Sequence, residues 1–572
     1  MGLLGPVIFQ NLPGQAVCIA IVDRLCKLNP LMQVLTTPRN FVPGPTPQEK
    51  LKVDKDGLDV IHDIYRYAQI GFKAIPEDDF DRFKWYGVYR QRPKDSGYFM
   101  LRTKIPGGQL NSAQLAVMGH IANDFGHGFG DITTRQTFQF HWLRIEDFPE
   151  VFERLSAVGM TTSGACGDDT RNVVGCPVAG IDKNEIIDAT PQLRDVNRHF
   201  TDNREFSNLP RKYKISVSGC RIHCAQPDIN CVGVFGLERK INGQLEAGFG
   251  IKVGGGLSSS PHLAQTLPVF LTPEDVLPMV HYTSVLFRDF GYREKRNRAR
   301  FKFLVSDMVK AGGVESILAK IEELAGRTFQ RHHEFIFPED PETDHLGVHE
   351  QKQPGLWYIG VCFAGGRTRG EQLLKIAELA KKYAQAGLDR ITTTNKQNLI
   401  LLNIPEKNLK SLQAELDANG FSWQPSNFRQ GCVSCTGMEF CNLAIAETKN
   451  RMMTLVEQLE TECAAYKDKI RIHFSGCPSS CGQHQVGDIG FRGGSTRING
   501  VATECFDMFI GGKLGADARF NELVKGKIPA TEIHKTVGKL LNYYTANRQP
   551  QEPFHAFANR TPKEQIKAAL EA

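Results

Sequence analysis

Residues 469–493, KIRIHFSGCPSSCGQHQVGDIGFRG, decide the fold, because a second copy of this stretch occurs earlier in the chain. The copy is KYKISVSGCRIHCAQPDINCVGVFG at residues 212–236, and the two align without a gap. Neither stretch is compositionally biased. The shared order of glycines and cysteines therefore indicates an internal duplication.

The duplication extends to a pair of segments upstream. Residues 105–142, which begin IPGG, correspond to residues 363–401, which begin FAGG, and both contain an ITT sequence. In the first of these segments and its flanks, residue patterns predict strands at 83–89, 98–105 and 132–142 and helices at 110–123 and 148–158. We expect each half to be a small α/β sandwich with a mostly antiparallel sheet, followed by a larger unit, and the halves to pack about a pseudo-twofold axis.

Four cysteines of the second half form two close pairs. Cys435 and Cys441 have five residues between them, and Cys477 and Cys481 have three. Four thiolates in this arrangement match the ligands of a 4Fe-4S cluster, in which each iron takes one cysteine. Buried free cysteines are one alternative, and a structural zinc site in a binding module is another. A zinc site explains neither the long five-residue spacing nor the duplication.

The first half has no such five-residue pair. It contains Cys220 and Cys224, and the nearest upstream cysteines are Cys166 and Cys176, which flank GDDTRNVVG. We infer that this copy lost its cluster and acquired another role, with a second metal site as the alternative.

The first half carries cations instead. Lys212 and Lys214 are two residues apart in an expected strand, so their side chains share a face. A solvated edge strand would explain such a pair, but the equivalent strand of the second half leads directly to the cysteines. By pseudo-symmetry a cationic wall then faces the cluster. This arrangement predicts reduction of a small oxyanion, because cations bind the anion and stabilise charge as its oxygens leave.

Together these motifs resemble those of the sirohaem-containing assimilatory sulfite and nitrite reductases. The shared elements are C-x5-C, SGC-x3-C, LPRKYK, FMLRTKIPGG and TTRQTFQ, and the resemblance begins near Pro43. It implies an α+β fold, internally duplicated, with two ferredoxin-like half-domains and two larger α/β domains for sirohaem and the cluster. The expected boundaries are an N-terminal arm at 1–50, half-domains at 51–160 and 341–425, and sirohaem domains at 161–340 (substrate side) and 426–572 (cluster side).

The resemblance also assigns residues. It implies six-electron reduction of sulfite to sulfide, or of nitrite to ammonium, at a sirohaem iron coupled to the cluster through the Cys481 thiolate. The implied cluster ligands are Cys435, Cys441, Cys477 and Cys481, and the implied substrate-side residues are Arg102, Arg171, Lys212 and Lys214. The expected contacts to sirohaem, which bears eight carboxylates, are Arg135, Gln136, Arg211, Arg300 and Asn395. This cation set argues against a plain electron carrier and against a tetrapyrrole enzyme of cobalamin synthesis.

Two positions bear on the substrate. Nitrite reductases of this family typically carry Asn where this chain has Lys214, and sulfite reductases carry Lys, so we favour sulfite. Nitrite reduction or dual activity is the alternative, because TRNVVGCPVAGID resembles the nitrite branch. In a sulfite-reducing branch a Tyr and a Cys beside the active site are covalently linked. Tyr89 and Cys166 occupy similar motif positions, with an unlinked core tyrosine and buried thiol as the alternative.

Composition constrains the partners. The 572 residues carry a formal net charge of +6, which does not indicate nucleic acid. Fifteen scattered cysteines are no disulfide framework and favour a reducing, cytoplasmic location. No GxGxxG occurs in a strand–turn–helix context, so we expect electrons from a small acidic ferredoxin or a separate flavoprotein. Residues 16–22 are too short for a membrane span and lack the flanks of a signal peptide. We expect a monomer.

Overall fold

The chain divides into two units, Met1–Pro38 and Arg39–Ala572. The computed structural model describes residues 35–339 and 345–571, so most of the predicted N-terminal arm lies outside the described residues. Helix α2 (Pro47–Asp54) begins inside the range predicted as arm, because Thr46 caps it by accepting the Glu49 N–H at 3.3 Å.

The first small unit contains a five-stranded antiparallel sheet. Its order is β1 (Val88–Arg90), β2 (Phe99–Arg102), β5 (Phe138–Leu143), β4 (Phe129–Ile132) and β13 (Arg367–Arg369). The helices of this unit are α3 (Val60–Ile70), α4 (Glu77–Arg82), α5 (Ser112–Phe125) and α6 (Phe148–Ala157).

Two predicted strands of this unit are wrong in detail. The strand predicted at 132–142 is a hairpin, because Gln136 adopts a left-handed conformation (φ 57°) and the Thr133 N–H donates to the Thr137 carbonyl at 2.8 Å. The stretch predicted as a strand at 83–89 begins as a 3₁₀ helix, Phe83–Tyr86, which ends at Gly87 with φ 74°. Both errors arise at turns, where apolar alternation carries no information about backbone reversal.

The second small unit repeats the first. Its antiparallel order is β11 (Gly347–Glu350), β12 (Leu356–Val361), β15 (Leu399–Pro405), β14 (Arg390–Thr393) and β3 (Gln109–Asn111), with helices α10 (Gly370–Tyr383) and α11 (Glu406–Ala418). Strand β3 comes from the first half, whereas β13 in the first sheet comes from the second. The halves therefore exchange edge strands and share one hydrophobic core.

The two larger units also share one topology. In the first, β6 (Val174–Gly175), β7 (Ile215–Val217) and β8 (Val232–Ile241) are parallel, and β9 (Gln244–Val253) and β10 (Gln265–Thr266) are antiparallel. In the second, β16 (Cys432–Ser434), β17 (Ile472–Ser475) and β18 (Ile489–Ile498) are parallel, and β19 (Val501–Ile510) and β20 (Glu522–Pro529) are antiparallel. This repetition confirms the duplicated α/β architecture.

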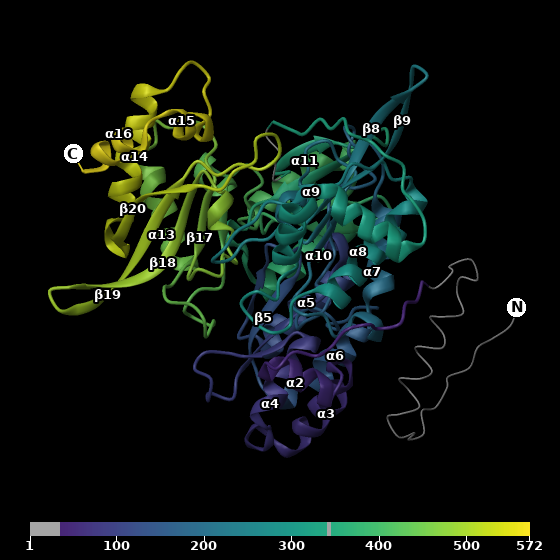
Figure 1. Ribbon diagram of the computed structural model, residues 1–572. Helices are drawn as coiled ribbons and strands as arrows, with labels where there is room; N and C mark the ends of the chain where they lie inside the picture. Colours follow the sequence, from purple (N-terminus) through teal and green to yellow (C-terminus); the bar gives the residue numbers. More distant parts are fainter. Residues whose placement is uncertain (1–34, 340–344, 572) are drawn as a thin grey trace, which may run out of the picture. The chain divides into compact units, whose positions relative to one another are not determined.

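Helices accompany each of these sheets. The first unit has α7 (Thr190–Phe200), α8 (Val276–Phe290) and α9 (Phe301–Ala325), and the second has α12 (Asn427–Gln430), α13 (Lys449–Glu462), α14 (Ile533–Asn547), α15 (Phe554–Arg560) and α16 (Lys563–Glu571). The β8–β9 and β18–β19 hairpins project beyond the rest of their sheets (Figure 1).

Glutamine amides mark the pseudo-twofold axis. Gln226 and Gln483 face each other, and each side-chain amide donates to the other, at 3.1 and 2.9 Å. Gln136 Nε2 donates to a backbone carbonyl of the second half at 3.0 Å, and Gln397 Nε2 donates to one of the first half at 2.8 Å. Equivalent residues thus make equivalent bonds across the seam, as the predicted symmetry requires.

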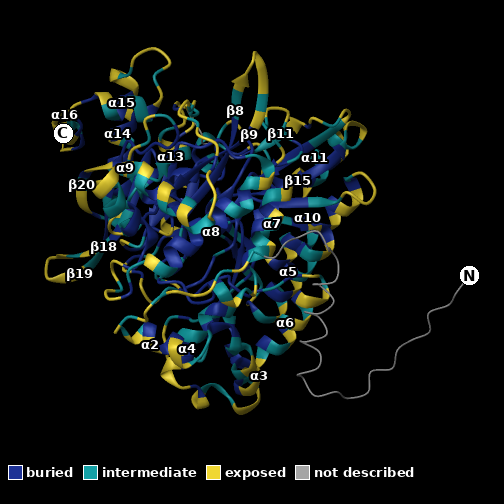
Figure 2. Cartoon of the chain, turned by 45° about the vertical axis from the view of Figure 1, so that its right-hand side comes forward, coloured by how far each residue is buried: buried dark blue, intermediate teal, exposed yellow. Residues whose placement is uncertain are grey.

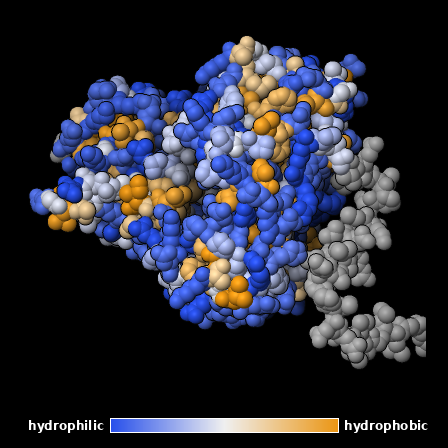
Figure 3. Space-filling model, turned by 60° about the horizontal axis from the view of Figure 1, so that its bottom comes forward, coloured by the Kyte–Doolittle hydropathy of each residue, from blue (hydrophilic) through white to orange (hydrophobic). Residues whose placement is uncertain are grey.

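Burial follows the sheets. Figure 2 shows buried residues concentrated in the sheets and exposed ones on the outer helices and hairpin tips. On the face seen in Figure 3, hydrophilic side chains cover most of the surface and apolar ones form small groups. Within the described ranges, no helix combines the length and apolar character that crossing a membrane requires.

Candidate active site

A cavity of about 600 Å³ brings the two predicted walls together. Residues from both halves line it. They include all four substrate-side cations and all four cluster cysteines, namely Arg102, Arg171, Lys212, Lys214, Cys435, Cys441, Cys477 and Cys481. Arg135 lines it too.

The cysteine wall is built on the ends of two neighbouring parallel strands. Cys435 follows β16, and Cys477 and Cys481 lie in the loop after β17. The Gly476 N–H donates to Cys435 Sγ at 3.2 Å, as amides do to cluster sulfurs. A side chain at Gly482 is excluded, because its Cβ would lie 1.8 Å from the Phe474 carbonyl oxygen.

Burial opposes ionisation of two of these thiols. Burial, followed by the charge of Cys481, raises the pKa of Cys435 to about 12, and burial also raises the pKa of Cys441. Thiolates at such positions persist when a metal binds them, because the metal replaces the proton. The cysteine wall therefore fits a bound cluster.

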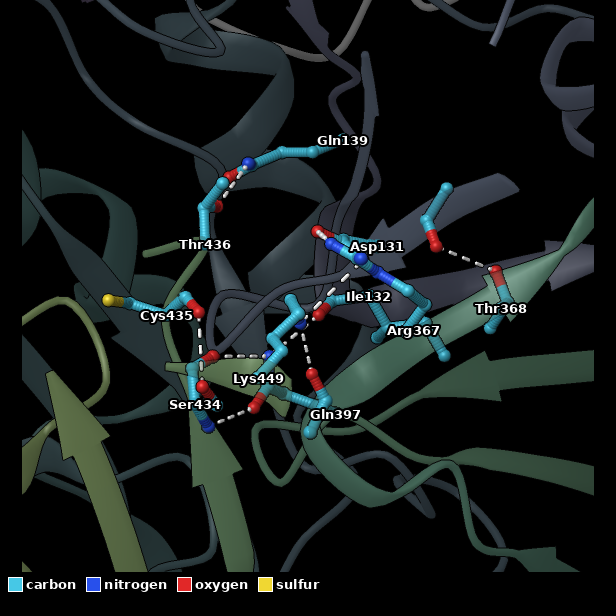
Figure 4. A network of polar contacts seen from close by, with 12 residues as sticks. Asp131, Ile132, Gln139, Arg367, Thr368, Gln397, Ser434, Cys435, Thr436 and Lys449 are labelled. Atoms are coloured by element: carbon cyan, nitrogen blue, oxygen red, sulfur yellow. Dashed lines mark hydrogen bonds and ion pairs between the residues drawn. The ribbon is translucent and has the colours of Figure 1, made fainter. Parts of the chain in front are cut away.

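A polar network from both halves supports the Cys435 loop (Figure 4). Gln397 Nε2 donates to the Ser434 carbonyl at 3.0 Å, and Gln139 Nε2 donates to Thr436 Oγ1 at 3.0 Å. Between these two contacts, buried Asp131 pairs with Arg367 at 3.1 Å and with Lys449 at 3.6 Å (Figure 4). Burial opposes ionisation of Asp131, but Lys449, His141 and Arg367 together outweigh it and hold the pKa of this carboxyl well below its usual range.

Sequence reasoning missed Lys449 and Thr134, which also line the cavity. Lys449 stands at the start of α13, and no motif marks it. Thr134 Oγ1 donates to the Cys481 carbonyl at 3.2 Å. The duplicated ITT sequence, to which Thr134 belongs, was the signal that could have identified it.

The cation wall carries buried positive charge without a counter-anion. Burial, followed by the charge of Arg300, lowers the pKa of Lys212 to about 7, and burial with Arg135 lowers the pKa of Lys214 well below its ordinary value. Among the described residues, neither ammonium group has a hydrogen-bond or ion-pair partner. Buried charge is costly unless an anion offsets it, so this wall fits an anionic ligand.

Several buried arginine side chains also carry nitrogen atoms that lack hydrogen-bond acceptors in the described structure. Buried Nε atoms of Arg102, Arg135, Arg171 and Arg300 lack hydrogen-bond acceptors within the described structure. Burial lowers the pKa of Arg135 to about 9, although its Nη atoms donate to Asn230 Oδ1 at 2.8 Å and to the Asn172 carbonyl at 2.6 Å. These orphaned donors fit the eight carboxylates of sirohaem.

The local structure at the cations differs in part from the prediction. Lys212 and Lys214 share the cavity face as predicted, but they precede β7. Only Tyr213, between them, forms a bridge, with Thr170. Arg135, predicted in a strand, lies in the β4–β5 turn.

Four predicted sirohaem contacts are not in the cavity lining. Gln136 uses its amide for backbone bonds, one of them from the Gly175 N–H at 2.9 Å. Arg211 lies 3.7 Å from an Asp168 carboxylate oxygen, and Asn395 Nδ2 donates to the Cys224 carbonyl at 3.3 Å. Arg300 is buried. Their roles as cofactor contacts stay predictions.

Tyr89 and Cys166 meet beside the cation wall. The Tyr89 hydroxyl hydrogen-bonds to the Cys166 thiol, and burial together with that thiol raises the pKa of Tyr89. Arg102 Nη1 lies 3.1 Å from Cys166 Sγ. Burial opposes ionisation of Cys166, but Arg102 and Arg171 outweigh it and lower the pKa of this thiol.

Comparison with known proteins matches this architecture. The family described as the nitrite and sulphite reductase 4Fe-4S domain matches residues 166–329 and 427–572, and the nitrite/sulfite reductase ferredoxin-like half domain matches 90–158 and 349–419. The assimilatory ferredoxin-dependent nitrite reductase of Haloferax mediterranei is 36% identical over 89% of this chain and 90% of its own length. Sulfite reductase (ferredoxin) 1 of Mycolicibacterium paratuberculosis is 35% identical over 91% and 95%.

A solved structure extends the likeness to three dimensions. The NirA protein of Mycobacterium tuberculosis is similar with a TM-score of 0.86 and 33% sequence identity, covering 91% of this chain and 98% of that one. Both family models match in both halves, which agrees with the repeated sheets described above. This chain belongs to the nitrite and sulfite reductase family, whose members carry sirohaem and a 4Fe-4S cluster.

Proposed function

We propose that this protein reduces sulfite to sulfide with electrons from a ferredoxin. The observation that carries the proposal is the pair of buried ammonium groups, Lys212 and Lys214, which have no anion partner in the described structure and share a cavity with the cluster cysteines. Nitrite carries one negative charge and sulfite two. A wall with two buried lysines therefore favours the more highly charged anion.

The protein's part in the reaction is binding and proton supply. Sirohaem and the cluster, when bound, supply six electrons one at a time. Arg102 and Arg171 hold the oxyanion by charge-assisted hydrogen bonds, and Lys212 and Lys214 donate protons as each oxygen leaves as water. Each departing oxygen takes two protons, and the lysines are reprotonated from solvent.

We assign the cofactor contacts by the same logic. Cys435, Cys441, Cys477 and Cys481 would hold the cluster, and the Cys481 thiolate would couple it electronically to the sirohaem. Cys481 suits this role because, of these four, it is the most exposed, and it lines the cavity together with Arg102, Lys212 and Lys214. Arg135, Gln136, Arg211, Arg300 and Asn395 contact sirohaem.

We also propose that the donor docks beside Cys441. Leu443 and Ile445 follow it closely and are 72% and 45% exposed, as apolar anchors of an interface are. Leu443→Ser is expected to lower the rate with reduced ferredoxin and leave the rate with reduced viologen unchanged. Equal losses with both donors would contradict this docking site. We propose a cytoplasmic monomer, which light scattering and cell fractionation test.

Parallel assays with reduced viologen test the substrate. We expect a higher kcat/KM for sulfite than for nitrite, measured on the purified holoenzyme. A higher value for nitrite would favour the alternative, a ferredoxin-dependent nitrite reductase. A colourless protein without iron would refute both.

A further inference from the structure

Three metal-ligand side chains meet outside the cavity lining, and a further cysteine lies beside them. Cys176 Sγ, Cys224 Sγ and a ring nitrogen of His345 all lie within 4.8 Å of one another. Cys220 Sγ is 3.2 Å from Cys224 Sγ and its thiol also interacts with that of Cys176, but it does not lie within 4.8 Å of all three ligand atoms. All four residues are at least nine-tenths buried. The mechanism above uses none of them.

The duplication explains how three of these side chains come together. Strands β6 and β7 pair in the same parallel register as β16 and β17, so Cys176, one residue after β6, occupies the position of Cys435. The loop with Cys220 and Cys224 is the copy of the cluster loop. The first half therefore retains three of four cluster-ligand positions, and only Cys441 has no counterpart. From the sequence, either Cys166 or Cys176 could have been the counterpart of Cys435. In the structure Cys166 lies beside the cation wall instead.

His345 takes the fourth place from elsewhere in the chain. It lies just before β11, at the start of the second half, and its Nδ1 is 3.4 Å from the Tyr358 hydroxyl. A metal-bound histidine usually engages its other ring nitrogen in such a contact, which fixes the ring. Because Nδ1 contacts the Tyr358 hydroxyl, we assign Nε2 as the metal-binding nitrogen.

We propose that Cys176, Cys220, Cys224 and His345 bind one Zn²⁺ ion. In a tetrahedral site with Zn–S near 2.3 Å, ligand atoms lie roughly 3.7 Å apart. The ligand atoms of Cys176, Cys224 and His345 already lie within 4.8 Å of one another. Cys220 Sγ, 3.2 Å from Cys224 Sγ, lies outside that set and completes the site by a small side-chain rotation. A 4Fe-4S cluster needs a wider set of sulfurs, because each cysteine binds a different iron. Three thiolates and an imidazole are a common structural zinc set.

The surroundings suit a closed structural site. The apolar side chains packed around the cysteines, which keep water from a fifth position, are Val178, Ala179, Ile181, Ile400 and Leu402. Zn²⁺ with three thiolates leaves one negative charge. Arg390, whose Nη2 donates to the Ala179 carbonyl at 2.9 Å, lies near Cys176 and offsets it. The Val178 N–H also points at the Cys176 sulfur.

The ion ties three distant segments together. One ligand follows β6, two follow β7, and the fourth precedes β11, where the second half begins. No two of these segments are adjacent in sequence. By binding all of them, the zinc links the junction between the halves to the first large sheet. Its role is structural and independent of electron transfer.

Metal analysis of the full-length holoenzyme tests the proposal. We expect about one zinc per chain, in addition to the iron of the cofactors, and zinc X-ray absorption with three sulfurs near 2.3 Å and one nitrogen near 2.0 Å. Cys176→Ala should reduce zinc to roughly a tenth or less. The matched control is Cys505→Ala, a buried cysteine on β19, which should keep its zinc.

Other outcomes would overturn the site. These are a wild-type enzyme with its full iron but less than roughly a tenth of a zinc per chain, a Cys220–Cys224 disulfide in the purified protein, or an extra iron–sulfur cluster on these cysteines. The zinc X-ray absorption spectrum of the wild-type enzyme tests the proposal even if Cys176→Ala fails to fold. His345→Cys provides a second check, because zinc should remain while its shell changes to four sulfurs.

Discussion

Replacing Lys214 by Asn should shift the substrate preference toward nitrite. The Lys214 amine is buried, lines the cavity and has no anion partner among the described residues. Burial lowers its pKa, and an anion bound beside it favours the charged form again, so the charge is expressed when the substrate is present. Asn retains a neutral hydrogen bond but removes the charge. A hydrogen bond to a charged group is worth about 1.5–3 kcal/mol and a neutral one about 0.5–1.5 kcal/mol, so the loss is roughly 1–1.5 kcal/mol per substrate charge.

Sulfite carries twice the charge of nitrite and should lose about twice as much. The difference between the two substrates is then also roughly 1–1.5 kcal/mol, or about tenfold in the ratio of their kcat/KM values. The assay measures both substrates with reduced viologen on sirohaem-loaded enzyme. Lys94→Asn is the matched control, because Lys94 lines the same cavity but is exposed and its charge is screened.

One result would refute this reasoning. If Lys214→Asn and the control leave the ratio equally unchanged while cofactor content is intact, Lys214 does not face the reacting anion. A shift toward sulfite would refute the charge argument itself.

Further predictions concern stability, the cluster and the tyrosine. Burial lowers the pKa of His281 to about 3, below its ordinary 6.5, so the stability contributed by its neutral form is complete above pH 6.5 and is lost as the pH falls toward 3. His281→Gln should therefore flatten the fall of Tm between pH 6.5 and 4, and an unchanged slope would contradict this. Gly482→Ala should lower bound iron and labile sulfide, because backbone must move by an amount that costs about 1–3 kcal/mol. Gly494→Ala, whose Cβ meets an ordinary contact at 3.7 Å, should retain both. If Tyr89 and Cys166 are linked, the intact mass is two hydrogens short, and a titratable Cys166 thiol in the folded protein would exclude the link.

The sequence alone predicted the duplication, the two large units and the four cysteines that meet in the cavity. These features are local in the chain. The matching order of glycines and cysteines in the two halves is visible in the sequence without knowledge of tertiary contacts. Strand periodicity predicted a shared face for Lys212 and Lys214; both line the cavity, although they lie just before β7 and not in a strand.

Tertiary structure decided what depends on distant partners. The exchange of β3 and β13 between the halves leaves no local signal, because each three-residue strand is stabilised only by the sheet that accepts it. The turn at Gln136 exists because its amide bonds the other half across the pseudo-twofold axis. The meeting of Cys176 with His345 likewise requires the folded junction between the halves, since contacts between residues so far apart in sequence form only when the whole chain packs.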